Sequence, residues 1–516
     1  MFNTNSKVKN IILSSTFGIV EQIVSYVITF VFQTVFLMVL SKNYLGISGL
    51  FSNILQIFSL AELGIGGVIS FRLYEPIKNR DVNKCGALLS FYKKMYHSLF
   101  WIVVLMGAFF YPFIDSIIKD ASEIPEDINL KLIYILFVIQ SASSYLCVYM
   151  QSLLSSDQKG YIVSLVSMIF KIIISAGKII VLVLTRNYTL TLIIGIILNF
   201  ILNLIFNIYI KRNYREIVDS KQVITKEERG NIFKDTRALF CHKIGYTVVK
   251  GTDSIILSKY IGVVVIGIYS NYVLITTAVD AVLNKLFGSF VSTIANMSLT
   301  KNSEERYGVY KKLFFANLWV SSLFTITMFV VINPFIEVWL DKSYLLSIVA
   351  VCMISFNLFC GSSRVINTSF INANGLFVKD KFRPVVEAGL NLVLSIILVN
   401  KVGLVGVILG TVLSTLLTVW WREPVILYKY VFERNVKEYF IYYMKWMILG
   451  IMTSAFFYFL CLKIPVSLIG IVIRLFICLA GINVIYILIF RKTDNYLFYK
   501  KLIIKKFIEV FKVGNK

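Results

Sequence analysis

The chain has 516 residues, of which 58% are hydrophobic and 16% are charged. Soluble proteins are about 45–50% apolar and about 25% charged, so this composition excludes a soluble globular protein and indicates a polytopic membrane protein. The formal net charge is +24. Lys and Arg are expected to collect on the cytoplasmic side of a membrane protein, so the basicity alone does not indicate a nucleic-acid partner.

A window of about 19 residues finds fourteen apolar stretches long enough to cross a bilayer. Each is expected to be an α-helix, because backbone polar groups in lipid must bond within their own segment. The predicted fold class is therefore an all-α polytopic membrane protein with about 14 transmembrane helices. The predicted spans are residues 10–40, 45–72, 95–118, 131–155, 161–185, 188–210, 244–260, 264–296, 313–339, 344–373, 384–400, 404–426, 439–462 and 466–490. The first stretch shows no small-residue cleavage site, so it is predicted to be an uncleaved helix.

Lys and Arg are distributed unevenly between the connections of these spans. With the N-terminus in the cytoplasm, the cytoplasmic connections hold 37 Lys and Arg and the outer connections hold 8. The positive-inside rule then predicts that both termini are cytoplasmic and that the number of spans is even. This distribution accounts for the net charge without nucleic acid. The outer residues are Lys42, Lys119, Lys131, Arg186, Lys259, Lys342, Lys401 and Lys463.

The longest polar connection lies between the sixth and seventh spans and is too short to be a domain. The predicted organisation is an N-terminal lobe at residues 1–210, a cytoplasmic linker at 211–243, a C-terminal lobe at 244–426, two further spans within 427–490 and a basic cytoplasmic tail at 491–516. The tail contains Lys500, Lys501, Lys505 and Lys506. It is predicted to be an interfacial amphipathic helix that binds anionic membrane lipid.

An internal repeat relates the two halves of the chain. The stretch Leu40 to Gly46 reappears as Leu257 to Gly262, and Gly49 to Asn53 reappears as Gly267 to Asn271. The second pair of stretches is offset by 218 residues, and at this offset Glu62 aligns with Asp280. A period of six spans preserves orientation, so the halves are predicted to be parallel repeats related by an axis along the membrane normal.

Charged residues inside the spans are the candidates for function, because each costs about 2.5–3.5 kcal/mol near the bilayer centre. They are Glu21, Glu62, Lys171, Lys178, Lys250, Asp253, Asp280, Lys285, Arg364, Lys445 and Arg474. Lys445 and Arg474 lie near span ends, where snorkelling suffices at least for Lys445. Lys250 and Asp253 are three residues apart and are able to neutralise each other.

The remaining cations are expected to line a hydrated cavity. Lys171 and Lys178 are seven residues apart, which places them on one helix face about 10 Å apart. Two like charges do not pair, so water, an acid on another helix or an anionic ligand must satisfy them. The candidate cavity cations are Lys250, Arg364, Lys285, Lys171, Lys178 and Arg72. A pyrophosphate suits such a cavity, and the acids Glu62, Asp253, Asp280 and Glu21 are then candidates for ion coupling or helix packing.

No metal site or disulfide framework is expected. The seven Cys fall almost entirely in apolar runs without a C-x-x-C pair, and only His97 and His242 are present. No cofactor is therefore predicted apart from a coupling ion, H⁺ or Na⁺.

Two motifs resemble a known family. The stretch Ala61-Glu62-Leu63-Gly64-Ile65-Gly66, continuing through Ser70-Phe71-Arg72-Leu73-Tyr74-Glu75-Pro76, is similar to the second-helix signature of bacterial Wzx-type polysaccharide flippases. The stretch from Thr252 to Lys259, with Gly267 to Tyr272, resembles the same family. The likeness extends to Asn372-Ala373-Asn374-Gly375 and to Phe382-Arg383-Pro384 with Glu387.

The resemblance carries expectations about fold and function. The family belongs to the multidrug/oligosaccharidyl-lipid/polysaccharide exporter superfamily, which also holds MATE drug exporters and MurJ-type lipid II flippases. It implies two six-helix lobes in a V plus two C-terminal helices, a cavity that opens alternately to each side, and a bacterial cytoplasmic-membrane location. The implied cargo is an undecaprenyl-pyrophosphate-linked oligosaccharide, with polysaccharide polymerase and glycosyltransferases as partners. MurJ-type relatives carry cavity arginines in the first two helices, whereas the first helix here offers Glu21 and no Arg, which argues against lipid II.

Two alternatives remain open from the sequence. A MATE-like antiporter of cationic drugs is expected to have a net-negative cavity, whereas the spans here contain five candidate cations and four acids. A membrane-embedded polysaccharide polymerase or ligase is expected to have a large outer loop with catalytic groups. The longest outer loop, about Lys119 to Leu130, has acids but no His or Arg. The chain is therefore predicted not to be an enzyme.

Overall fold

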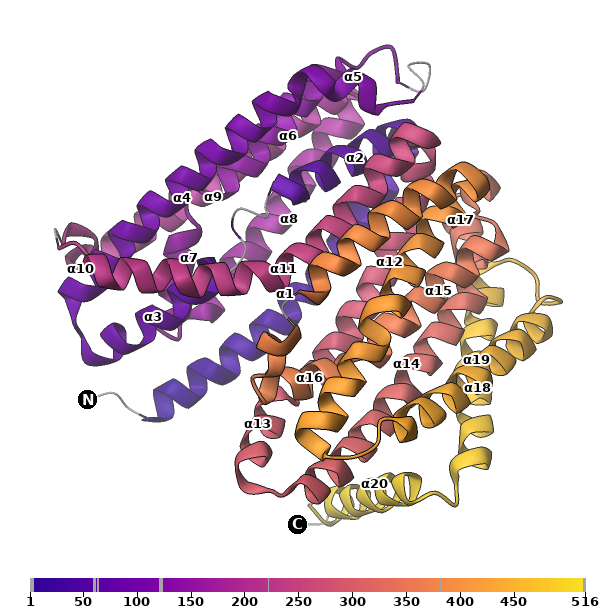
Figure 1. Ribbon diagram of the computed structural model, residues 1–516. Helices are drawn as coiled ribbons and strands as arrows, with labels where there is room; N and C mark the ends of the chain where they lie inside the picture. The colour runs from indigo at the N-terminus through magenta and orange to yellow at the C-terminus, as the bar shows by residue number, and fades with distance from the viewer. Residues whose placement is uncertain are drawn as a thin grey trace. The chain divides into compact units, whose positions relative to one another are not determined.

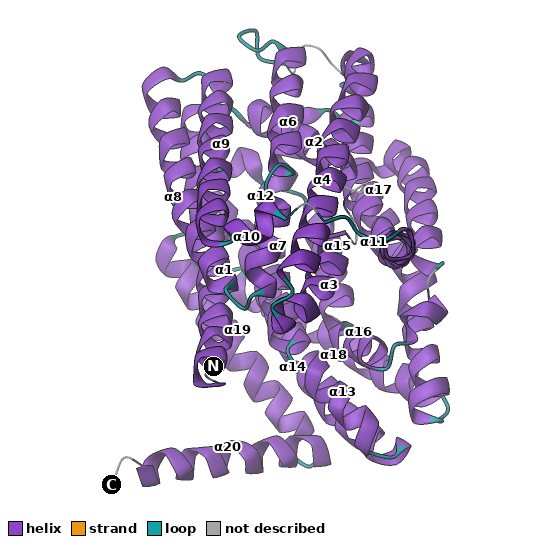
Figure 2. Cartoon of the chain, turned by 90° about the vertical axis from the view of Figure 1, so that its left-hand side faces the viewer, coloured by secondary structure: helices purple, strands orange, loops and turns teal. Residues whose placement is uncertain are grey.

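The structure is a computed structural model that describes residues 4–58, 62, 65–119, 124–220, 222–380 and 382–513. For residues 4–12, 14–15, 67, 235, 237–250, 292, 299–300, 377–378 and 505–513 it describes the backbone alone. The described segments are helices joined by short connections and include no strand (Figure 2). The all-α prediction is therefore confirmed.

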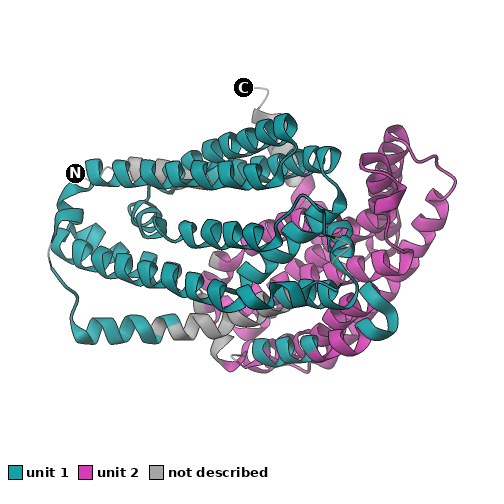
Figure 3. Cartoon of the chain, turned by 90° about the horizontal axis from the view of Figure 1, so that it is seen from above, with its two compact units in different colours: residues 1–270, 384–392, 399–404 teal, residues 271–383, 393–398, 405–516 magenta. Residues whose placement is uncertain are grey.

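The chain divides into two units, drawn in separate colours in Figure 3. Unit 1 comprises residues 1–270, 384–392 and 399–404. Its helices are α1 (Thr4–Val39), α2 (Lys42–Phe58), α3 (Ile65–Asn79), α4 (Val82–Phe110), α5 (Ile114–Ile117), α6 (Leu130–Ser144), α7 (Val148–Ser156), α8 (Gly160–Thr185), α9 (Tyr188–Asn213), α10 (Arg215–Asp219) and α11 (Lys226–Tyr260). The predicted lobe boundaries stay a prediction.

Unit 2 comprises residues 271–383, 393–398 and 405–516. It holds α13 (Val291–Thr300), α14 (Ser303–Trp339), α15 (Ile348–Ser363), α16 (Val365–Ala373), α18 (Lys437–Cys461), α19 (Leu468–Phe490) and α20 (Asp494–Val513). Two helices contribute to both units, α12 (Val263–Gly288) and α17 (Arg383–Leu427). Both are labelled in Figure 1.

The helices account for all fourteen predicted spans. Within the described residues, eleven segments are long and apolar enough to cross a membrane. One of them, residues 383–432, covers two predicted spans, because Val402 and Gly403 interrupt the helix, with φ of +60° at Gly403. Glycine adopts this left-handed conformation without a Cβ clash. The other two predicted spans, 45–72 and 244–260, correspond to α2 with α3 and to the second half of α11.

The orientation deduced from charge predicts a labelling pattern. Lys42 begins α2, and Lys342 lies in the turn between α14 and α15. Cys introduced at either position is expected to react with an impermeant thiol reagent added outside intact cells. Cys at Lys221, which lies outside the described residues, is expected to react only after permeabilisation. The reverse pattern would overturn the assigned orientation.

The order of helices repeats along the chain. The N-cap residues of α6 and α15, Asn129 and Ser347, are 218 residues apart, and the side chain of each accepts a hydrogen bond from the amide three residues later. Each of these helices is then broken, α6 from α7 at residues 145–147 and α15 from α16 at Arg364. The helix order therefore follows the sequence repeat, and the axis that relates the halves stays a prediction.

Glycines of the repeated motif allow a close helix crossing within unit 1. A Cβ added to Gly46 would lie 1.9 Å from the carbonyl oxygen of Val263, and one added to Gly267 would lie 2.2 Å from that of Lys42. The starts of α2 and α12 thus approach backbone to backbone. Small residues at such crossings are the usual means of packing membrane helices.

Gly267→Ala is expected to lower the amount of folded protein, because the methyl group meets backbone that has no space to move. The expected loss of stability is about 1–3 kcal/mol. The measurement is the thermal stability of the detergent-purified protein. Gly450→Ala on α18 is the matched control, since nothing lies within 4 Å of a Cβ there. Equal stability of both variants would contradict the close crossing.

Candidate functional site

The first group of predicted site residues lies between α1 and α8 in unit 1. Lys171 Nζ donates a hydrogen bond to Ser25 Oγ and interacts electrostatically with Glu21. Lys178 Nζ lies 5.5 Å from the centre of the Phe32 ring. Ser25 and Phe32 are seven residues apart on α1, and their partners Lys171 and Lys178 are seven residues apart on α8 in the same order. The helices α1 and α8 therefore run parallel here.

Lys178 is the cation with the least compensation in this group. Among the described residues no carboxylate pairs with it, and its partner is the face of Phe32. Its stem packs against α9, where a Cβ added to Gly195 would lie 2.3 Å from Lys178 Cε. Cation–π attraction contributes about 0.5–2 kcal/mol, which is less than the cost of a charge within a membrane. Water or an anion is therefore needed beside Lys178.

The second group surrounds Glu62, at the break between α2 and α3. The Glu62 carboxyl group interacts with the hydroxyl groups of Tyr96 on α4 and Tyr145 after α6. The two tyrosine rings stack with centroids 6.5 Å apart, and both residues are buried. Glu62 thus lies beside two buried aromatic side chains whose hydroxyl groups interact with it electrostatically.

The third group lies in unit 2 at the break between α15 and α16. Arg364 donates through Nε and through a terminal nitrogen to the two carboxylate oxygens of Glu423 on α17, at 3.2 and 2.5 Å. The Glu423 side chain is 3% exposed. Arg364 also has further interactions within the unit. This bidentate arrangement fixes the guanidinium plane as well as neutralising its charge.

Glu423 belongs to a larger charge network. Arg383 at the start of α17 lies 4.0 Å from Glu423 and 2.5 Å from the carboxylate of Asp380. Arg422 approaches the other oxygen of Asp380 at 3.9 Å. Burial raises the pKa of Asp380, although the neighbouring Arg383 acts in the opposite direction. Three arginines and two acids therefore join the break between α15 and α16, and the segment that precedes α17, to α17.

The remaining predicted site residues lie apart from these groups. Asp253 on α11 interacts with Tyr269. Arg72 on α3 lines a recess of about 600 Å³ together with Lys84, which pairs with Glu228 of α11 at 3.2 Å.

On α12 the backbone carbonyl of Asp280 accepts a bond from Asn284, and Lys285 is exposed. The side chain of Lys250 lies outside the described residues. A single cavity lined by all the candidate cations stays a prediction.

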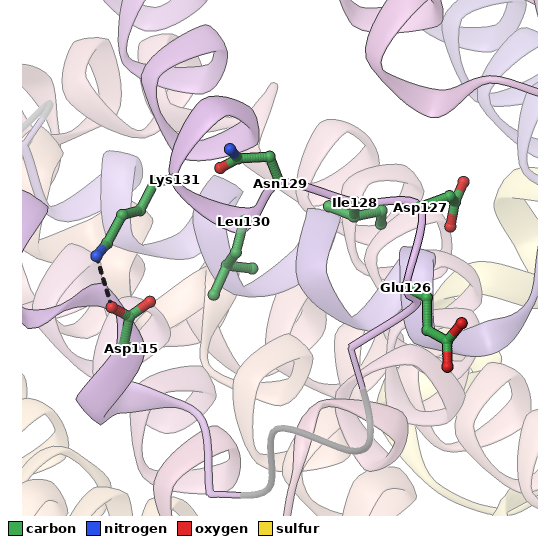
Figure 4. A pocket seen from close by; sticks show the side chains of 7 residues that line it. All are labelled: Asp115, Glu126, Asp127, Ile128, Asn129, Leu130 and Lys131. Carbon is green, nitrogen blue, oxygen red and sulfur yellow. Dashed lines mark ion pairs between the residues drawn. The ribbon is translucent and has the colours of Figure 1, made fainter.

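A separate pocket of about 550 Å³ lies at the connection between α5 and α6 in unit 1 (Figure 4). Lys131 pairs with Asp115 at 2.7 Å, whereas Glu126 and Asp127 extend away from that pair. Asp127 instead accepts a hydrogen bond from Tyr44. The acids do not converge, and no group of three potential metal ligands occurs in the described part of the chain, so this pocket offers no metal site.

The partners of Arg364 and Glu62 were not among the predicted site residues. Glu423 lies inside the predicted span 404–426 and is therefore recognisable from the sequence as an intramembrane charge, but it was not included among the predicted site residues. Tyr96 and Tyr145 carry no sequence signal, because buried tyrosines are common in helical membrane proteins. Their role beside Glu62 follows from the fold alone.

No protein-family model matches the chain, and no curated protein matches it. Solved structures do. The lipid II flippase MurJ in an inward closed conformation superposes with a TM-score of 0.66 at 15% identity, covering 93% of this chain and 99% of MurJ. An inward-facing multidrug resistance MATE transporter of the MOP superfamily gives a TM-score of 0.61 at 13% identity, with coverage of 78% and 94%. The eukaryotic MATE transporter AtDTX14 gives 0.53 at 13% identity, with coverage of 84% and 97%.

The chain has the MurJ–MATE fold. At these identities the likeness concerns the fold and carries no substrate with it. The superfamily fold that the sequence resemblance implied is nevertheless present, and the chain is a multi-pass membrane protein.

Proposed function

We propose that the protein moves an undecaprenyl-pyrophosphate-linked oligosaccharide across the cytoplasmic membrane by alternating access, for cell-surface polysaccharide biosynthesis. The observation that carries the proposal is Lys178, a cation within a span that no described carboxylate neutralises. Lys171 lies on the same face of α8. At an effective dielectric of about 20, each close cation attracts a unit charge by about 4 kcal/mol, so a pyrophosphate is a suitable counter-anion.

Arg364, Lys250, Lys285 and Arg72 are further candidates for cargo binding in this proposal. The likeness to the lipid II flippase MurJ supports a lipid-linked cargo as a class. Glu62 between its two tyrosines is the candidate for ion coupling, with Asp253, Asp280 and Glu21 as alternatives. The proposed coupling ion is H⁺ or Na⁺.

A cationic-drug antiporter is the second candidate, because MATE transporters share the fold. The two candidates differ in the charge that the site must attract. An unneutralised Lys178 repels a cationic drug and attracts a phosphate. The drug exporter therefore requires an arrangement in which the acids outweigh Lys171 and Lys178.

The test is deletion of the gene followed by localisation of lipid-linked oligosaccharide. The proposal expects oligosaccharide to accumulate on the cytoplasmic face, where it stays inaccessible to an externally added glycosidase until the cells are permeabilised. Restoration by a plasmid copy is the control for effects on neighbouring genes. Normal surface polysaccharide together with increased drug sensitivity would favour the second candidate.

A further inference from the structure

A groove in unit 1, away from the α1–α8 face, has features of a lipid site. Its volume is about 750 Å³, within the range of pockets that hold small molecules. Residues of α4 and α9 line its sides, residues of α7 line its floor, and residues of α10 line one end. Figure 1 shows α10 beside the start of α4 and the end of α9. By the charge-derived orientation this is the cytoplasmic end of these helices.

One side of the groove is apolar. Ile197, Phe200, Ile201 and Leu204 line it from α9, and each is at least 40% exposed. Their spacing of three to four residues forms one stripe along the helix. A stripe of this kind at the depth of the lipid tails accepts an acyl chain.

The end nearest the cytoplasm is basic. Lys93 on α4 and Lys211 in the last turn of α9 both line the groove and are exposed. His97 lies one turn from Lys93, whose backbone carbonyl is 2.8 Å from His97 Nδ1. Anionic lipid of the cytoplasmic leaflet attracts such side chains by about 1 kcal/mol each.

Two buried polar atoms in the groove lack partners. Asn207 Oδ1 on α9 and Ser220 Oγ after α10 make no hydrogen bond with any described residue. Other polar atoms of the floor are satisfied, since Cys147 Sγ donates to the carbonyl of Asn203 and the Asn203 amide donates to the carbonyl of Ser143. A buried carbonyl oxygen without a donor costs about 1–3 kcal/mol, so Asn207 favours a ligand that brings a hydroxyl group.

We propose that this groove binds one phosphatidylglycerol molecule of the cytoplasmic leaflet. The phosphate lies between Lys93 and Lys211, a glycerol hydroxyl donates to Asn207 Oδ1, and an acyl chain follows the stripe on α9. Phosphatidylglycerol combines the negative charge that the lysines require with the hydroxyl groups that Asn207 requires. The site is independent of the transported cargo.

The test uses the delipidated full-length protein in detergent, titrated with phosphatidylglycerol, phosphatidylethanolamine or phosphatidic acid and measured by native mass spectrometry. The wild type is expected to prefer phosphatidylglycerol over phosphatidylethanolamine. The double variant Lys93→Gln, Lys211→Gln is expected to weaken phosphatidylglycerol binding by about tenfold or more, because two charge contacts are lost. Lys94→Gln with Arg212→Gln is the matched control, since these neighbours do not line the groove.

Asn207→Leu tests the contact with the glycerol hydroxyl independently of the contacts between the lysines and the phosphate. This variant is expected to bind phosphatidylglycerol no better than phosphatidic acid, which has the phosphate without the glycerol. Thermal stability of each variant shows that the fold is retained. Absence of lipid preference in the wild type, or equal losses in the groove variant and the control variant, would overturn the proposal.

Discussion

Glu423→Ala is expected to remove most of the folded protein from the membrane. The substitution leaves Arg364 without its bidentate partner and removes the carboxylate that also lies 4.0 Å from Arg383. Breaking a buried ion pair by removing one partner costs about 3–5 kcal/mol, a large part of the stability of a typical domain. The measurement is membrane abundance by quantitative immunoblot, together with thermal stability of the purified fraction.

Matched variants separate the ion pair from a general effect of substitution. Glu305→Ala, at an exposed position in the first turn of α14, is expected to change stability by less than about 0.5 kcal/mol. The double variant Arg364→Met, Glu423→Met is expected to recover most of the lost abundance, because paired charges replaced together by apolar groups leave nothing unpaired. If that stable double variant transports normally, Arg364 has no part in cargo binding.

The double variant Lys171→Gln, Lys178→Gln is expected to lower transport at least about tenfold while abundance stays near that of the wild type. Lys178 pairs with no described carboxylate, and Glu21, which interacts with Lys171, is only half-buried, so neutralising both lysines leaves no fully buried acid behind. The expected loss is therefore attraction for the cargo rather than stability. Flux and abundance must be measured on the same membranes.

Two further substitutions sharpen this result. Lys445→Gln on α18 neutralises an exposed cation near a span end and is expected to leave transport unchanged. Gly195→Ala keeps every charge but forces the Lys178 side chain to move, because the new methyl group would lie 2.3 Å from Lys178 Cε. A partial loss of transport is expected from Gly195→Ala. A fall in abundance that matches the fall in flux would indicate that Lys171 and Lys178 have a structural role instead.

Much of the fold was predictable because the bilayer imposes a simple length and polarity rule on each helix. The limits of the apolar runs correspond to the observed helices within a few residues in most cases, as for 161–185 and α8 at Gly160–Thr185. The exceptions are helices whose sequence is interrupted or polar. The span 45–72 corresponds to two described helices, α2 and α3, and α11 begins in the polar linker at Lys226, where Thr225 and Glu228 form a capping box.

The candidate site was less predictable, because sequence periodicity locates a residue on its own helix but not its neighbour on another. Arg364 was selected from the sequence as a free cavity cation, yet it faces Glu423, 59 residues away along the chain. Lys171 and Lys178 were placed correctly on one face of α8, but the register with Ser25 and Phe32 of α1 required the fold. The spacing of residues along one helix does not predict which residues of another helix they contact.

The most direct measurement of the central claim is transport in proteoliposomes of the purified protein. A fluorescent undecaprenyl-pyrophosphate-linked oligosaccharide is placed in the inner leaflet, and its arrival outside is followed by cleavage with an added glycosidase. The account predicts that the wild type exposes the oligosaccharide much faster than protein-free liposomes and that the Lys171→Gln, Lys178→Gln variant does so at least about tenfold more slowly than the wild type. Oligosaccharide movement no faster than in protein-free liposomes, under an imposed H⁺ or Na⁺ gradient of either direction, would contradict it.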